Sequence, residues 1–209
     1  MRPYTIIFTT MTIDGRIADP RGFSKLSCLE DYKLQHLLRA SVDGVMVGSN
    51  TALKDDPRLT VRLAPGKSPY RIVVDSRLRV PPTARIFNPP EKGIILTTEC
   101  IDKTRINEYK RRGIIVISKG CKSVDLKNSF KELYSDVGIK KLMIEGGGIL
   151  NYIVLSEGLV DEIWITVSPM IFGSGRSVFD GPDSIMRGLS LKEYKIICGG
   201  WVHLRYIVA

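Results

Sequence analysis

The residues best suited to chemistry in this chain are a carboxylate and three glycines that follow one apolar run. Residues 142–144 are short and apolar enough for a buried strand, and Glu145, Gly146, Gly147 and Gly148 come next. Apolar residues then recur at helical spacing, so the glycines join a strand to a helix. Glycines at such a place let a ligand approach the backbone and leave N–H groups free for an anion. We therefore predict a phosphate-binding turn beside Glu145, where open α/β sheets bind their ligands.

The alternative is a turn that only packs the strand against the helix, but one glycine would be enough for that purpose. The G-x-G-x-x-G fingerprint of dinucleotide-binding folds does not occur at this turn. No acidic residue follows at the spacing expected for ribose recognition either. Any cofactor is therefore expected to bind in another way.

A second polar cluster follows the apolar residues 45–47. Ser49 or Asn50 is expected to cap a brief helix there. Thr51 and Asp55 are four residues apart and would share one face of that helix. The pair Asp55 and Asp56 is either a cap with its neighbour or a ligand contact, and the position beyond a strand end makes the two interpretations equal.

Ser76 and Arg77, directly after the apolar residues 71–74, could grip a phosphate monoester through a hydroxyl and a guanidinium. An exposed turn is an equally good interpretation. The formal net charge of +9 favours anionic partners. Because the basic residues are spread along the chain without interleaved aromatics, a phosphorylated small molecule is a better candidate than nucleic acid.

The metal-binding and redox residues are few. The sequence has two histidines and four widely separated cysteines, Cys28, Cys100, Cys121 and Cys198. We therefore expect no protein-built metal centre, no zinc site and no disulfide framework. A strand-like segment begins at once, and no apolar run is long enough to span a membrane, so we expect a cytoplasmic protein.

The elements that position these residues alternate between strand and helix. Apolar periodicity predicts strands at residues 4–8, 45–47, 71–74, 93–97, 113–117, 142–144, 160–167, 194–197 and 202–208, and helices at 30–41, 103–111, 126–134 and 150–156. Ser27 is expected to cap the first helix. This order predicts an α/β fold with a mostly parallel, mixed central sheet, helices on both faces and antiparallel C-terminal strands. One domain, residues 1–209, is the simplest organisation.

Several motifs occur in a fixed order along nearly the whole chain. The most specific are Asp55-Asp56-Pro57-Arg58-Leu59-Thr60 and Glu145-Gly146-Gly147-Gly148; the others are residues 12–18, 38–44, 48–51, 71–76 and 159–162. Together they resemble the reductase family of riboflavin biosynthesis, which has a dihydrofolate-reductase-like fold. The chain lacks the His-x-Glu and Pro-Cys-x-x-Cys motifs of the zinc deaminase fused to bacterial members, so it is similar to the stand-alone archaeal and fungal type.

This resemblance implies an activity and a set of contacts. The activity is reduction of 2,5-diamino-6-ribosylamino-4(3H)-pyrimidinone 5′-phosphate by NADPH, with hydride transfer to the sugar C1′ of a ring-opened imine. The implied cofactor contacts are Thr10, Thr51, Asp55, Ser76 and the backbone of Gly147, Gly148, Ile149, Leu150, Asn151, Tyr152 and Ile153. The implied substrate contacts are Ser24, Arg39, Leu59, Arg62 and Glu145. Arg77 is our own candidate for the 2′-phosphate of the cofactor.

The proton donor stays open at this point. Asp55 and Glu145 are the carboxyl candidates, and either can be a binding group only. Bacterial members of the family often carry a lysine where Phe8 stands, so no role of that lysine is transferred. The segment 173–175 departs from the expected double glycine and receives no role.

Two alternatives remain. A reductase of dihydrofolate or another pterin would share the fold, and a non-catalytic protein that binds nucleotides or nucleic acid would explain the charge. The family also implies a homodimer, which residues 160–167 and 202–208 would permit.

Overall fold

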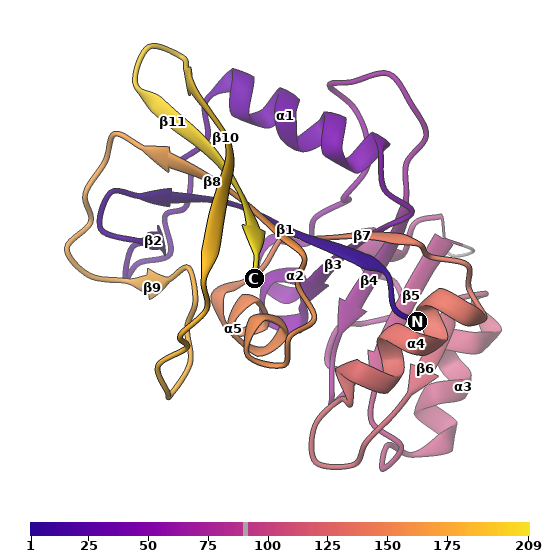
Figure 1. Ribbon diagram of the computed structural model, residues 1–209. Helices are drawn as coiled ribbons and strands as arrows, with labels where there is room; N and C mark the ends of the chain where they lie inside the picture. Colours follow the sequence, from indigo (N-terminus) through magenta and orange to yellow (C-terminus); the bar gives the residue numbers. More distant parts are fainter. Residues whose placement is uncertain (90–91) are drawn as a thin grey trace.

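The computed structural model describes residues 1–89 and 92–209, and a nine-stranded sheet forms its centre (Figure 1). The strand order is β10-β11-β8-β1-β7-β3-β4-β5-β6. The parallel strands are β1 (Tyr4–Thr12), β3 (Gly44–Gly48), β4 (Tyr70–Val74), β5 (Gly93–Thr97), β6 (Ile115–Ser118), β7 (Lys141–Ile144) and β8 (Glu162–Ser168). The strands β10 (Leu189–Ile197) and β11 (Trp201–Val208) extend the β8 edge in antiparallel pairing. The prediction of a mostly parallel, mixed sheet is confirmed.

Helices cover both faces of the parallel part of the sheet. They are α1 (Leu29–Ala40), α2 (Ser49–Asp55), α3 (Lys103–Arg111), α4 (Leu126–Ser135) and α5 (Gly148–Ser156), with a short 3-10 helix at Arg85–Phe87. On β4, Ile72 packs into the core that contains α4 and α5, while Val73 packs into the core that contains α1 and α3. Because the side chains of a strand alternate between faces, apolar residues fill the strand without a break. A separate two-stranded sheet joins β2 (Arg16–Ala18) and β9 (Arg176–Ser177).

The predicted helix caps were wrong. Cys28 precedes α1 and Gly48 precedes α2, and neither makes a side-chain cap hydrogen bond. The Ser27 hydroxyl instead lies 2.9 Å from the hydroxyl of Thr10. The Ser49 hydroxyl accepts a hydrogen bond from Arg79. Tertiary partners therefore replaced the local capping contacts that the sequence favours.

The expectation of no disulfide framework was also wrong, because disulfides join Cys28 to Cys198 and Cys100 to Cys121. The first links the start of α1 to the turn between β10 and β11, across 170 residues of sequence. Cys100 and Cys121 lie just beyond β5 and β6, which are adjacent parallel strands. Since adjacent parallel strands end side by side, the residues that follow them meet despite their separation in sequence.

None of the helices in the described part of the chain is both long enough and apolar enough to cross a membrane.

Candidate functional site

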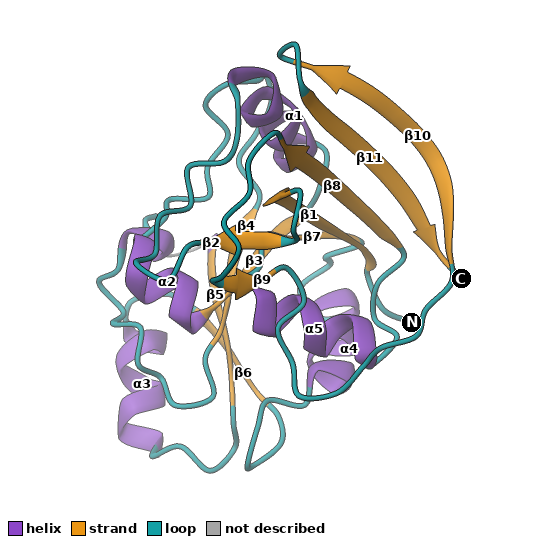
Figure 2. Cartoon of the chain, turned by 90° about the vertical axis from the view of Figure 1, so that its left-hand side faces the viewer, coloured by secondary structure: helices purple, strands orange, loops and turns teal. Residues whose placement is uncertain are grey.

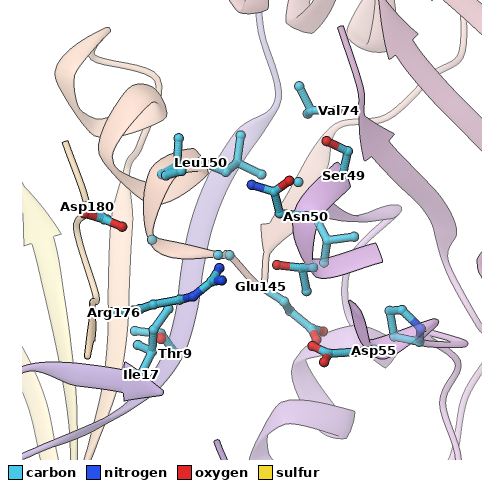
Figure 3. Close-up of a pocket in the computed structure, with 18 of the residues that line it drawn as sticks. Thr9, Ile17, Ser49, Asn50, Asp55, Val74, Glu145, Leu150, Arg176 and Asp180 are labelled. Carbon is cyan, nitrogen blue, oxygen red and sulfur yellow. The ribbon is translucent and has the colours of Figure 1, made fainter. Parts of the chain in front are cut away.

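A cavity of about 750 Å³ opens at the carboxyl ends of β1, β3, β4 and β7. It brings together the two motifs that the sequence placed far apart. A Cβ atom on Gly147 would lie 3.2 Å from the hydroxyl oxygen of Thr51, so the glycine turn and the start of α2 are in contact. Figure 3 shows the walls of the cavity, with Arg176 and Asp180 entering from one side and Ser49, Asn50 and Asp55 from the other.

Backbone geometry requires glycine at two positions of the turn. Gly146 has φ +87°, a left-handed conformation that favours glycine. A side chain on Gly148 would collide with the backbone oxygen of Ser177, so only glycine fits at the first position of α5. The nine-residue helix α5 begins at the cavity wall, and Gly147 and Gly148 are among the residues that line the cavity. This is the arrangement expected for an anion-binding turn.

Glu145 and Arg39 form a buried ion pair at the base of the cavity. Arg39 Nε and Nη2 donate to the two carboxylate oxygens of Glu145, each at 2.6 Å, and both side chains are 7% exposed. Gln35, one turn before Arg39 on α1, donates to the same carboxylate at 3.0 Å. Burial alone would lower the pKa of Arg39, but Glu145 raises it above its ordinary value. Arg39 therefore orients Glu145, which keeps lone pairs for a ligand.

A smaller hollow of about 300 Å³, which we call the arginine pocket, adjoins this ion pair. Arg39, Asp55, Asp56, Pro57, Arg58, Leu59, Arg62 and Arg85 line it. Burial and the neighbouring Arg39, Arg58 and Arg85 lower the pKa of Arg62, with Glu145 acting in the opposite direction. Guanidinium groups crowded in this way favour a multiply charged anion. Sequence reasoning missed Arg85, which the segment after β4 brings to the pocket, and it assigned no role to Arg58.

His36 supports the arginine pocket from behind and was also missed. Its Nδ1 accepts backbone N–H bonds from Arg62 at 2.8 Å and from Leu63 at 3.3 Å. Burial first, and then the charges of Arg39 and Arg62, lower the pKa of His36 to about 4. His36 is therefore neutral at pH 7 and fixes the loop that carries Arg62.

Most of the candidate residues lie together. The cavity is lined by the candidates Thr10, Ser24, Arg39, Thr51, Asp55, Leu59, Ser76, Glu145, Gly147, Gly148, Ile149, Leu150 and Ile153, and Arg62 lines the arginine pocket. Three candidates line neither. Asn151 is buried and donates to the backbone of Val178, Tyr152 packs near Gly181, and Arg77 is exposed.

Several lining residues had no sequence signal. Arg176 and Asp180 come from the segment after β8, which received no role. This segment approaches the cavity because Gly175, with φ +126°, lies against the backbone of Ala18. Such a contact between distant segments has no local pattern in the sequence.

Comparison with known proteins agrees with this geometry. The sequence model of the family described as the RibD C-terminal domain matches residues 3–203. The 2,5-diamino-6-ribosylamino-4(3H)-pyrimidinone 5′-phosphate reductase of Methanothermobacter thermautotrophicus is 44% identical over 186 residues, which are 87% of this chain and 85% of that protein. The protein of the same name from Archaeoglobus fulgidus is 36% identical, with 96% of each chain covered.

Solved structures show the same fold. Form 2 of Acinetobacter baumannii RibD has a TM-score of 0.86 and 25% identity, and the match covers all of this chain but 58% of that one. A dihydrofolate reductase from Enterococcus faecalis has a TM-score of 0.57 at 11% identity, covering 98% of this chain and 96% of that one, which indicates a shared fold alone. The expected dihydrofolate-reductase-like fold is confirmed, and this chain belongs to the RibD C-terminal domain family.

Proposed function

We propose that this protein is an NADPH-dependent reductase of 2,5-diamino-6-ribosylamino-4(3H)-pyrimidinone 5′-phosphate, which it converts to the ribitylamino product. The names of the relatives support the reaction. The observation that carries the proposal is the buried pair of Glu145 and Arg39 in the same cavity as the glycine turn. One feature suits a heterocycle with N–H donors, and the other suits a phosphate-bearing cofactor.

The residues on the α2 and α5 side of the cavity fit a nicotinamide dinucleotide. Gly147 and Gly148 open the N-terminus of α5 toward a diphosphate, and Thr51 and Ser76 supply hydroxyl groups along the same wall. When bound, the cofactor supplies hydride to the sugar carbon. The chain's own contribution is to place donor and acceptor in contact and to exclude water from them.

The substrate is expected to occupy the side of the cavity bounded by α1. Glu145 accepts hydrogen bonds from ring and amino N–H groups, and Arg39 holds its carboxylate in place. Because Arg39 is engaged in this way, the 5′-phosphate is expected in the arginine pocket with Arg58, Arg62 and Arg85. Arg39, which the family resemblance gave as a substrate contact, is therefore proposed to support Glu145.

The direct test is NADPH oxidation by the purified protein with the ribosylamino-pyrimidine phosphate. The deaminated counterpart and dihydrofolate serve as competing candidate substrates. We expect turnover with the first compound well above the other two, and preference for dihydrofolate would contradict the proposal.

Glu145→Gln is expected to weaken substrate binding at least tenfold and to change NADPH affinity less than threefold, because one charged acceptor is lost from the substrate side only. Equal losses in both titrations would remove Glu145 from the substrate site.

We also propose that the protein is a homodimer that pairs through one apolar face of β10 and β11. Figure 2 shows these strands at the outer edge of the sheet. A β-bulge between Leu191 and Glu193 shifts the alternation of side chains along β10. The apolar residues before and after the bulge therefore lie on the same face of the strand. That face carries Leu189, Leu191, Tyr194 and Ile196 of β10 and Val202, Leu204, Tyr206 and Val208 of β11. The four β10 side chains are 44–72% exposed, which is typical of an interaction surface.

A further inference from the structure

Asp31 is a buried carboxylate directly behind the cavity wall. It lies on α1 and is 0% exposed. Its Oδ2 accepts a hydrogen bond from the hydroxyl of Thr10 at 2.6 Å, and its Oδ1 accepts one from Thr166 at 2.5 Å. The Thr10 hydroxyl lies 2.9 Å from that of Ser27, and both residues line the cavity. A continuous path of hydrogen bonds therefore connects the cavity to Asp31.

The direction of these bonds follows from counting protons. Thr10 and Thr166 each donate their single hydroxyl proton to Asp31. Ser27 must then donate to Thr10, and His203 Nδ1, 2.9 Å from the Thr166 hydroxyl, must donate to Thr166. The free lone pairs of Ser27 are left for a donor in the cavity. The path is thus oriented to take up a proton from a bound molecule.

None of the ion pairs in the described residues includes Asp31. Burial lowers the pKa of His203, with weaker effects from Asp31, Arg205, Glu193 and Lys195, so this imidazole is neutral at pH 7. Asparagine at this position could form hydrogen bonds from α1 to β1 and β8 with a smaller desolvation penalty than a buried carboxylate that has no ion-pair partner. Buried titratable groups of this kind cluster at functional sites.

The reaction needs such a group. If the proposed function holds, the cyclic ribosylamine must open before hydride arrives. Its exocyclic nitrogen loses a proton while the C1′–O4′ bond breaks, a C1′=N bond forms and O4′ takes a proton from solvent. Hydride then adds to C1′, the C=N electron pair moves to nitrogen, and nitrogen takes a proton back. One hydride and one solvent proton are consumed, and the group that stored the nitrogen proton is regenerated.

We propose that Asp31 is this store, and that the hydroxyls of Ser27 and Thr10 carry the proton between it and the substrate nitrogen. The other carboxylates of the site are less suited. Two charged hydrogen bonds from Arg39 hold Glu145, Asp55 and Asp180 are exposed, and Glu157 lies at the C-terminal end of α5. Asp31 acts through Thr10 and Ser27, so it is a positioning and proton-storing residue that does not contact substrate.

The test compares Asp31→Asn and Thr10→Val with the wild type in NADPH oxidation by the ribosylamino-pyrimidine phosphate. We expect kcat to fall about 10²-fold in both variants, the range typical of lost proton transfer. The dissociation constant of NADPH, from fluorescence titration, should change less than threefold in Asp31→Asn, because Asp31 is buried and does not line the cavity. Thr10→Ser keeps the hydroxyl and should retain kcat within a few fold. Thr5→Val, which removes a buried hydroxyl from β1 far from Asp31, is the matched control and should keep full activity.

The double variant Asp31→Asn/Thr10→Val should be no slower than Asp31→Asn alone, because the two residues serve one path. The relay is overturned if either single variant keeps kcat within threefold of the wild type, or if the two losses multiply. Should Asp31→Asn fail to fold, the comparison of Thr10→Val with Thr10→Ser decides alone. Absence of wild-type turnover would instead contradict the proposed function, so the two failures are distinguishable.

Discussion

Arg79 lies where a cation could select between phosphorylated and unphosphorylated cofactors. Its Nη2 donates to the Ser49 hydroxyl at 2.6 Å and to Asn50 Oδ1 at 2.8 Å. Ser49, Asn50 and the nearby Ser76 line the cavity. Arg77, the residue expected from the sequence, is exposed and lines neither pocket. Arg79 lines neither pocket either, but its hydrogen bonds to Ser49 and Asn50 connect its guanidinium to two residues of the cavity wall.

We expect Arg79→Ala to reduce the preference for NADPH over NADH about tenfold, because one charged hydrogen bond to the 2′-phosphate is lost. Arg77→Ala is the matched control, with the same charge change two residues away. The measurement is kcat/KM with each cofactor at fixed substrate concentration. A larger effect of Arg77→Ala would restore Arg77 as the phosphate ligand.

At the scale of elements, α1 is the support of the substrate side. Successive turns of this helix present Asp31, Gln35, His36 and Arg39 to the cavity wall, to Glu145 and to the loop that carries Arg62. Apolar periodicity predicted this helix at residues 30–41, where Leu34, Leu37 and Leu38 recur at helical spacing, although Leu37 is 50% exposed. The polar face of the helix carries the functional contacts.

His36 makes stability depend on pH in a defined window. Its folded pKa of about 4 is below the unfolded value of 6.5, so the unfolded chain binds more protons between these values. Stability is full above pH 6.5 and falls as the pH approaches 4, by up to about 3 kcal/mol. Denaturant unfolding at pH 7 and pH 4.5 should show a smaller pH effect for His36→Asn than for the wild type. Parallel pH dependences in the two proteins would contradict this assignment.

The sequence predicted elements better than contacts, and the reason is physical. Apolar periodicity is local, so the strand at residues 93–97 was predicted to the residue and the α3 helix matched its expected bounds. The glycine turn was also readable, since three adjacent glycines mark a backbone constraint. The Asp31 path, the Cys100–Cys121 link and the approach of Arg176 arise from strand order, which periodicity does not encode.

At the scale of the molecule, the two faces of the β8–β11 extension differ in character. One face carries an ionic network in which burial would raise the pKa of Glu162, but hydrogen bonds from Lys192, Trp164 and Tyr4 lower it to about 2. The opposite face is the apolar surface of β10 and β11, which is exposed on β10 and half-buried on β11. A sheet whose charged face makes its own ion pairs, and whose apolar face is partly exposed, is suited to pairing with a second copy through the apolar face.

We expect Ile196→Lys to convert the dimer to a monomer, because a charge would be buried between the paired faces. Ile196 is 72% exposed in the single chain, so the substitution should leave the unfolding midpoint of the monomer within a few degrees. Lys195→Ala, on the opposite face of the same strand, is the control. Sedimentation velocity of the three proteins gives the answer, and a monomeric wild type would refute the interface.

The bond between Cys28 and Cys198 gives the chain an unusual topology when it is denatured. The oxidised polypeptide remains a large ring with two short tails, residues 1–27 and 199–209, and the bond between Cys100 and Cys121 closes a smaller loop within the ring. Such a ring has far fewer conformations than an open chain of the same length. Ser27, the first residue of the proposed proton path, is adjacent to Cys28. In the oxidised unfolded chain, the disulfide therefore keeps this residue of the cavity wall close to the residues that form the turn between β10 and β11.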